Sequence, residues 1–438
     1  MSILKKMATG SLATGKVLTD LSRAQANWEL QMSRVILGKR WKWLLVAMLP
    51  VLFGVGLEVA SAADLPGYLG GHKGYMPSFV TLNMFIGSIF VGLMAGLITG
   101  VIGAGGGYVL TPALMSIGVK GIMAVGTDQF HLFAKGIMGT VIHKKLGNVN
   151  FWIAVWFVLG SVTGATTGGM INRAIYQKSP ALSDAFISLI YVVMLGILGA
   201  YAMYDWVSSN KKNKTADGNI TEATTKFAKW LQSIQLKPRV KFDEDIVPGG
   251  RSMAVYPIII VGFIVGNLAA MMGVGGGFVT FPIFVYGFGI STFTTVGTDI
   301  LQIIFTTAYS SITQYAVYGY VFYSVAMGML LGSLVGIQMG AMATKIMKGT
   351  TIRAIYALTI VAGFTNRLCS LPPKLNDAGY LSISSKSTAV LTSVGNTVFF
   401  VLVIVFSIWI MASFFKGIGK FREQARAEAE AKLSTASN

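Results

Sequence analysis

The sequence has little of what soluble enzymes depend on. Only 12% of its 438 residues are charged, and Cys369 is its one cysteine, which excludes an intramolecular disulfide and a thiolate metal cluster. The three histidines show no metal-ligand spacing. The chain also carries no P-loop, no G-x-S-x-G elbow and no H-E-x-x-H motif. We therefore expect a protein that is not an enzyme, with no catalytic residue, no cofactor and no bound metal.

Acidic residues are also scarce: 17 Asp and Glu stand against 35 Lys and Arg, giving a formal charge of +18. A charge of this sign suits nucleic acid, but the basic residues lie in tails and in loops between apolar stretches, without any recognition module. The excess of basic residues in cytoplasmic loops of membrane proteins explains the charge better. We expect membrane lipid, and no nucleic acid, as a partner.

Long apolar runs are abundant, and about 20 apolar residues suffice for a helix to cross a bilayer. Hydrophobic residues make up 53% of the chain. The sequence therefore predicts an all-α polytopic membrane protein, in which the third and eighth hydrophobic segments are too short to cross as straight helices. The twelve segments are 43–60, 79–102, 106–118, 122–143, 149–172, 184–206, 253–273, 276–290, 294–317, 320–344, 351–368 and 389–413.

The distribution of basic residues predicts the topology. If each segment crosses once and the N-terminus is inside, 27 of the 35 Lys and Arg are cytoplasmic and seven are external. Both termini are then cytoplasmic. Residues 39–64 imitate a signal peptide through a basic flank, an apolar run and a small-residue end. The long lead-in of 38 residues favours retention of this segment, and cleavage is the alternative.

An internal repeat organises the chain. "GAGGGYVLTP" at 103–112 matches "GVGGGFVTFP" at 273–282, "VGTD" at 125–128 recurs at 296–299, and "LGSVTGATTGG" at 159–169 matches "LGSLVGIQMGA" at 331–341. Each copy holds about five segments, an odd number, so the second copy enters the membrane from the opposite side. We predict two inverted repeats, as in many secondary transporters.

The repeat divides the chain into six parts. The two transmembrane repeats occupy 79–206 and 253–368, and a cytoplasmic linker, 207–252, joins them. In the linker "SSNKKNKTADGN" has a flexible composition, and "TEATTKFAKWLQSI" is typical of a short amphipathic helix at the membrane surface. The remaining parts are an N-terminal extension with one span and an external loop at 1–78, an external loop and last span at 369–413, and a charged cytoplasmic tail at 414–438.

The glycine runs predict a broken helix in each repeat. Irregular backbone is tolerated at membrane depth only where it is buried in protein or lines a cavity, and the start of a helix offers amides that attract anions. We therefore expect a small anionic substrate to bind there. Close helix packing is the alternative, and it is the favoured reading for Gly160, Gly164, Gly168 and Gly169, which have helical spacing. The candidate substrate-binding residues are Gly103, Gly105, Gly106, Gly107, Gly273, Gly275, Gly276 and Gly277.

Asp128 and Asp299 are the repeated carboxylates, each preceded by a threonine, Thr127 and Thr298. A helix cap at the start of a long helix is the favoured interpretation. Because ionisable residues inside membrane segments are costly and usually functional, coupling to H+ or Na+ is the second interpretation, and unrelated polar packing is the third.

His131 and Lys135 share a helix face with Asp128 and are its candidate charge partners. The second copy has no charge at the position of Lys135, so a role in ion pairing is favoured over ligand contact.

With the doubled "GAGGGYVLTPAL…VGTD" and "GVGGGFVTFPIF…VGTD" motifs, the chain resembles the sulfite exporter TauE/SafE family, also called the toluene sulfonate uptake permease family. The resemblance implies transport of sulfite, thiosulfate or sulfoacetate-type anions across a bacterial inner membrane. The N-terminal extension and the long central loop depart from the shorter family pattern. A secondary transporter working by alternating access is the leading hypothesis, and an anion channel or a membrane scaffold without flux are the alternatives. No feature of the sequence indicates an oligomeric state.

Overall fold

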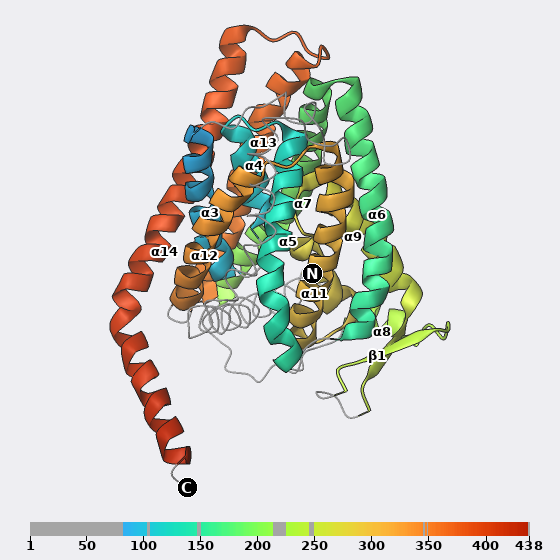
Figure 1. Cartoon of the computed structure of the whole chain (residues 1–438), viewed down its shortest axis with the longest axis vertical. Helices are drawn as coiled ribbons and strands as arrows, with labels where there is room; N and C mark the ends of the chain where they lie inside the picture. The colour runs from blue at the N-terminus through green and yellow to red at the C-terminus, as the bar shows by residue number, and fades with distance from the viewer. Residues whose placement is uncertain are drawn as a thin grey trace.

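The described part of the chain is almost entirely helical. A computed structural model describes residues 82–102, 106–146, 150–212, 225–244, 249–344, 347 and 349–436, so the first predicted segment, 43–60, and the extension at 1–78 lie outside the described residues. The helices run mostly along the long axis of the molecule (Figure 1). They are α3 (Leu82–Ile102), α4 (Gly107–Ser116), α5 (Gly121–Leu146), α6 (Phe151–Lys178), α7 (Pro180–Lys212), α8 (Lys226–Ser233), α9 (Val255–Met272), α10 (Gly277–Pro282), α11 (Thr292–Tyr309), α12 (Tyr323–Thr344), α13 (Gly349–Asp377) and α14 (Ser385–Ala436).

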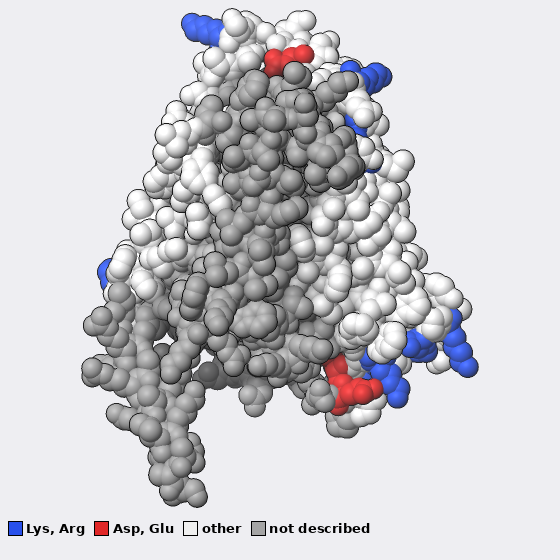
Figure 2. Space-filling model, viewed as in Figure 1, with Lys and Arg blue, Asp and Glu red and all other residues white. Residues whose placement is uncertain are grey.

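Seven of the described helices are long and apolar enough to span a bilayer: α3, α6, α7, α9, α12, α13 and α14. Charged side chains visible in Figure 2 lie mainly toward the two ends of the molecule, and the described surface between them is largely uncharged. The chain is therefore an all-α polytopic membrane protein, as predicted. The count of twelve crossings stays a prediction, because α5 and α11 are outside this set of seven.

Helices from the two halves pair with each other across the molecule. The first helix of one half packs against the fourth helix of the other, so that α3 lies along α12 and α9 lies along α6. The fifth helices, α7 and α13, also pack together, as do the third helices, α5 and α11. The pairing of α3 with α12 is therefore matched by the pairing of α9 with α6, and the other two pairs each join equivalent helices of the two halves.

Glycines allow these pairs to approach at the level of the backbone. On α6, Gly160, Gly164 and Gly168 lie against the carbonyl groups of successive turns of α9, where any added Cβ would collide. Glycines on α12 do the same against α3: Gly332 faces Ile89 and its neighbours follow at regular spacing. The spaced glycines of 159–169 therefore serve helix packing, the role their periodicity favours. Gly169 instead faces the side chain of Gln314.

The two short segments differ from the long helices as predicted. The third is the ten-residue α4, and the eighth is the six-residue α10, which continues directly into a π-helix, Ile283–Phe288. A second π-helix, Ser310–Tyr315, and a 3₁₀ turn, Ala316–Tyr318, follow α11. Such irregular turns are frequent at functional sites.

The linker between the halves is more ordered than its polar composition indicated. It contains α8, where an amphipathic helix is predicted, and a hairpin of β1 (Arg239–Phe242) and β2 (Arg251–Ala254) that the sequence analysis missed. The strands pair antiparallel, with Val240 opposite Met253. Phe242 is buried with these two residues in a small core. The apolar face of the hairpin thus anchors it below α6 and α9 (Figure 1).

Candidate functional site

The two glycine runs meet in the interior of the bundle. α3 ends at Ile102 and α4 begins at Gly107, while α9 ends at Met272 and α10 begins at Gly277. A Cβ built on Gly107 would lie 2.8 Å from the Cα of Val274, so the backbones of the two runs are in direct contact. Gly106 and Gly107 of the first run are buried, whereas Gly103 and Gly105 lie outside the described residues.

The second run has backbone geometry that favours glycine. Gly273 closes α9 with φ of 82°, and Gly276 precedes α10 with φ of 83°, both in the left-handed region. A Cβ on Gly273 would also lie 2.8 Å from Oγ1 of Thr111 and from the Cα of Val125. Gly275 and Gly277 lie between or beside these positions and are buried as well. The chain therefore makes a tight break between α9 and α10, in which three of the four residues 273–276 are glycines.

Tyr191 of α7 connects the two runs. Its hydroxyl lies 2.5 Å from the carbonyl oxygen of Met272 and 3.4 Å from that of Gly107, and its side chain is fully buried. The hydroxyl donates to the carbonyl of Met272, at the end of α9, and reaches the start of α4 at the same time. Tyr191 could not be identified from the sequence, because one tyrosine in an apolar segment carries no distinguishing signal.

The repeated aspartates lie inside their helices. α5 begins at Gly121 and α11 at Thr292, whose N-cap is Ser291, so Asp128 and Asp299 both follow their helix start by two turns. The helix-cap interpretation does not fit these positions. Asp128 is fully buried, and its Oδ2 accepts a hydrogen bond of 2.9 Å from Oγ1 of Thr111 on α4.

Thr127 and Thr298 bind backbone at matching places in the two halves. Oγ1 of Thr127 accepts a 2.9 Å hydrogen bond from the amide of Phe322, just before α12. Oγ1 of Thr298 accepts a 3.1 Å hydrogen bond from the amide of Asn150, just before α6. Each third helix is thus attached to the start of the fourth helix of the opposite half.

His131 lies against Asp128, and Lys135 follows one turn later. Nδ1 of His131 is 3.7 Å from Oδ1 of Asp128, and its Nε2 is 3.0 Å from Oγ of Ser333 on α12. Lys135 is half-buried and close enough to interact electrostatically with both residues.

Asp299 has a different neighbour, since Nε2 of Gln302 donates a 2.7 Å hydrogen bond to its Oδ1. Its Oδ2 lies 3.1 Å from the point that a Cβ of Gly277 would occupy. The structure therefore places the second aspartate directly beside the second glycine run.

Arg367 is the most deeply buried of the arginines whose side chains the structure describes. Its guanidinium donates to Oδ1 of Asn366 and, at 3.2 Å, to the carbonyl of Pro112 in α4. Asn366 in turn donates a 2.9 Å bond to Asn396 of α14. Arg367 thus fixes the last turn of α4, where a cation is favoured by the helix dipole.

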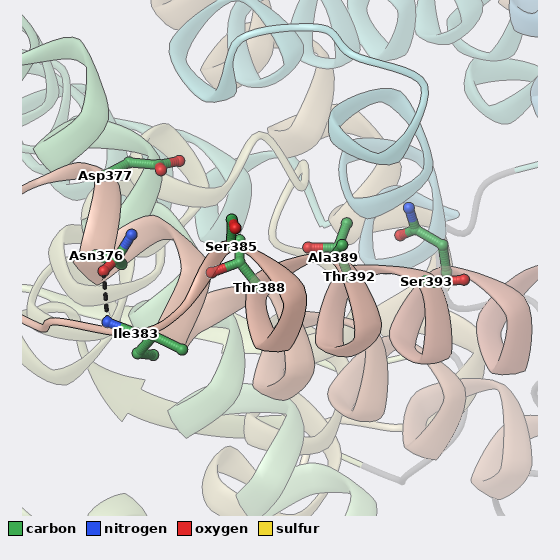
Figure 3. A pocket seen from close by; sticks show the side chains of 9 residues that line it. Asn376, Asp377, Ile383, Ser385, Thr388, Ala389, Thr392 and Ser393 are labelled. Atoms are coloured by element: carbon green, nitrogen blue, oxygen red, sulfur yellow. Dashed lines mark hydrogen bonds between the residues drawn. The ribbon is translucent and has the colours of Figure 1, made fainter.

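A polar pocket opens beside Asn396, at the turn between α13 and α14 (Figure 3). It has a volume of about 600 Å³, and the amide of Ile383 donates to Asn376 at its rim. None of its lining residues comes from the glycine runs. The pocket is lined by Asn376, Asp377, Ile383, Ser385, Thr388, Ala389, Thr392, Ser393 and Asn396.

Comparisons with known proteins agree with a transport function. A family model described as "Sulfite exporter TauE/SafE" matches residues 88–366. Probable membrane transporter protein YjnA of Bacillus subtilis is 24% identical over 262 residues, which cover 59% of this chain and 89% of YjnA. YunE of the same organism, also named a probable membrane transporter protein, is 23% identical over 63% of this chain and 94% of its own length. The probable membrane transporter protein MJ0441 of Methanocaldococcus jannaschii is 28% identical over 44% of this chain and 59% of its own length. No solved structure matches the chain significantly.

Proposed function

Because the chain belongs to the sulfite exporter TauE/SafE family of membrane transporters, we propose that it moves a small sulfur oxyanion or organosulfonate across the bacterial inner membrane. The substrate is of the sulfite, thiosulfate or sulfoacetate type, and transport follows alternating access. The sequence holds no Walker A motif, so the driving force is an ion gradient, the membrane potential or the gradient of the substrate itself.

The contact between Gly107 and Val274 is the observation that carries this proposal. It brings the start of α4 and the break between α9 and α10 to one place inside the bundle. Backbone amides at such breaks offer hydrogen-bond donors and partial positive charge to an anion. In broken-helix transporters substrates are held in this way near the bilayer midplane. In this proposal Gly103, Gly105, Gly106, Gly107, Gly273, Gly275, Gly276 and Gly277 form the substrate site.

The exchange of helices between the halves supports alternating access through inverted repeats. α3 pairs with α12 and α9 with α6, while Thr127 and Thr298 make equivalent bonds across the molecule. A fold built from two related halves has two related conformations, each open to one side. Rocking of the two tightly packed helix pairs against the central breaks exposes the site to one side at a time.

We further propose that transport of the anion is coupled to a cation. Asp128 and Asp299 are buried carboxylates beside the glycine runs, and a buried charge is costly without a partner. Binding of H+ or Na+ at one of them supplies that partner. The proposal places both termini in the cytoplasm, in accordance with the charge bias.

Transport assays on the purified chain in proteoliposomes test this function. We expect counterflow of [35S]thiosulfate, in which unlabelled substrate inside the vesicle accelerates uptake of label. Gly106→Val and Gly276→Val should abolish this exchange, because a Cβ would lie 2.5 Å from Oγ1 of Thr99 in the first case and 2.6 Å from Cγ1 of Val265 in the second. Gly87→Ala is the matched control, since its nearest contact would be an ordinary 3.5 Å.

The alternatives give other results. An anion channel passes current without acceleration by internal substrate, and a scaffold shows neither flux nor saturable binding. Normal exchange by both Gly106→Val and Gly276→Val would contradict the role of the glycine runs. A binding screen of sulfite, thiosulfate, sulfoacetate, taurine and sulfate then identifies the preferred anion.

A further inference from the structure

The two repeats differ at the residue that faces the buried aspartate. In the second copy Gln302 stands three residues after Asp299 and donates a 2.7 Å hydrogen bond to it. In the first copy His131 stands three residues after Asp128, and the facing atoms are 3.7 Å apart. An amide NH2 group can donate a hydrogen bond to a carboxylate at any pH, whereas an imidazole nitrogen can donate one only when that nitrogen carries a proton.

Hydrogen bonding on the far side of the imidazole guides the assignment of its proton. Oγ of Ser333 donates its single hydrogen to the carbonyl of Leu330 at 3.2 Å. We assign this direction, so that Ser333 accepts at its other contact and Nε2 of His131 donates across 3.0 Å. In the neutral ring, Nδ1 then presents a lone pair toward Oδ1 of Asp128.

Neither of these two facing atoms has a hydrogen-bond partner in the described part of the chain. Both side chains are at most 1% exposed. Two buried acceptors that face each other are unfavourable, because each has lost its water without gaining a donor. One proton, on Oδ1 or on Nδ1, turns the pair into donor and acceptor once they close from 3.7 Å by about 0.5–1 Å.

We propose that Asp128 and His131 together form the proton-binding site that couples transport to the proton gradient. This inference rests on the proposed transport function and names its coupling ion. It also assigns coupling to the first copy alone, because the Gln302 amide leaves no place for a proton in the equivalent contact of the second. A sodium ion is disfavoured, since it requires several oxygen ligands and His131 supplies nitrogen.

Other charged and titratable groups interact with the pair. Lys135 on α5 interacts electrostatically with both residues, and Tyr191 of α7 interacts with Asp128 and donates to Met272. Asp299 lies on α11, which packs against α5. α12 contributes the neutral Ser333, and α4 the neutral Thr111. Nδ1 of His131 lies 3.7 Å from Oδ1 of Asp128, the carboxylate oxygen that Thr111 does not bind.

A short path joins the proton site to the glycine runs. Thr111 donates to Oδ2 of Asp128, and a Cβ on Gly273 would lie 2.8 Å from the same hydroxyl. An anion at the break and an ionised Asp128 repel each other, and a proton removes that repulsion. Proton and anion therefore bind cooperatively, and by linkage each favours the other. The expected mode of transport is symport.

The test uses proteoliposomes that contain the full chain, [35S]thiosulfate and a lumenal pH dye, with the membrane potential clamped. With acid outside, the wild type should accumulate thiosulfate and acidify the lumen, and each pH unit is worth about a tenfold concentration ratio per co-transported proton. Asp128→Asn and His131→Gln should keep counterflow at equal pH on both sides but lose the accumulation. Gln302→His is the matched variant in the second copy and Gly87→Ala is a distant control, and both should retain accumulation.

The outcomes separate the two proposals. Wild-type counterflow that ignores the pH gradient, or undiminished accumulation by His131→Gln, overturns the proton site while leaving the transporter intact. Absence of counterflow in the wild type overturns the proposed function itself for thiosulfate.

An infrared titration of the purified protein gives a readout independent of transport. A carboxylic-acid C=O band should appear or shift with pH in the wild type, vanish in Asp128→Asn and change frequency in His131→Gln. A band that is identical in all three proteins would also overturn the assignment.

Discussion

The backbone of Gly107 in α4 touches the backbone of Val274, at the break between α9 and α10. Only 2.8 Å would separate a Cβ on Gly107 from the Cα of Val274, and the obstructing atom belongs to the main chain. Two interruptions far apart in the sequence are therefore a single structural feature. The effect that an added methyl group at this contact has on transport can be measured directly.

Gly107→Ala is expected to abolish or strongly reduce substrate exchange. The added methyl group would force α4 and the 273–276 segment apart, since a Cβ contact under 3.0 Å with backbone cannot be relieved by a side-chain rotation. Counterflow in proteoliposomes measures the loss. Gly87→Ala, which adds the same methyl group in ordinary contact with Ile117, should exchange like the wild type.

Tyr191→Phe is expected to weaken transport more than it weakens folding. The substitution keeps the ring but removes the hydroxyl that donates to Met272, which leaves a buried carbonyl unsatisfied at a cost of about 1–3 kcal/mol. The break then loses its fixed geometry. A reduced exchange rate at a nearly unchanged level of folded protein is the expected result, and unchanged exchange would show that the hydroxyl is dispensable.

Gly164→Ala should lower stability. Gly164 lies directly against the carbonyl of Phe263, and a Cβ would be 2.9 Å from the amide of Asn267, so α6 and α9 must separate. Overpacking of this kind costs about 1–3 kcal/mol. Thermal unfolding in detergent measures it, with Gly199→Ala as the control because its added methyl group would meet only side-chain methyl groups, at 3.3 Å or more, and no backbone.

Asp243→Ala should destabilise the junction between the hairpin and α11. The Asp243 carboxylate accepts bonds from the amide of Ser291 at 2.8 Å, from its hydroxyl at 2.6 Å and from Oγ1 of Thr294 at 2.6 Å. Loss of hydrogen bonds to a charged group costs about 1.5–3 kcal/mol each, less whatever water restores. The neighbouring Glu244→Ala, at an exposed position, is the control, and equal melting temperatures for the two variants would argue against this role.

Much of the fold could be predicted from the sequence, because apolar runs of membrane-spanning length have few alternatives to the helix. The repeated glycines also identified the breaks. The contact between them could not be derived from one sequence, since it depends on how α3, α4, α9 and α10 pack in three dimensions.

Two features were beyond sequence reasoning for identifiable reasons. Asp128 follows Gly-Thr, a pattern that suits a helix start, yet the helix extends back to Gly121 because the preceding residues are apolar and buried. The hairpin lies in a polar linker, and its apolar positions, Val240 and Phe242, form a pattern too short to stand out. Tertiary packing determines both where α5 begins and that the hairpin forms.

The crossed pairing of α3 with α12 and of α6 with α9 has a consequence for biosynthesis. When the ribosome has delivered α3, the surface that its glycines expose has no mate until α12 emerges, and α6 likewise waits for α9. We therefore expect that neither half matures as an independent unit, and that the N-terminal half stays incompletely packed until the helices of the C-terminal half have been inserted.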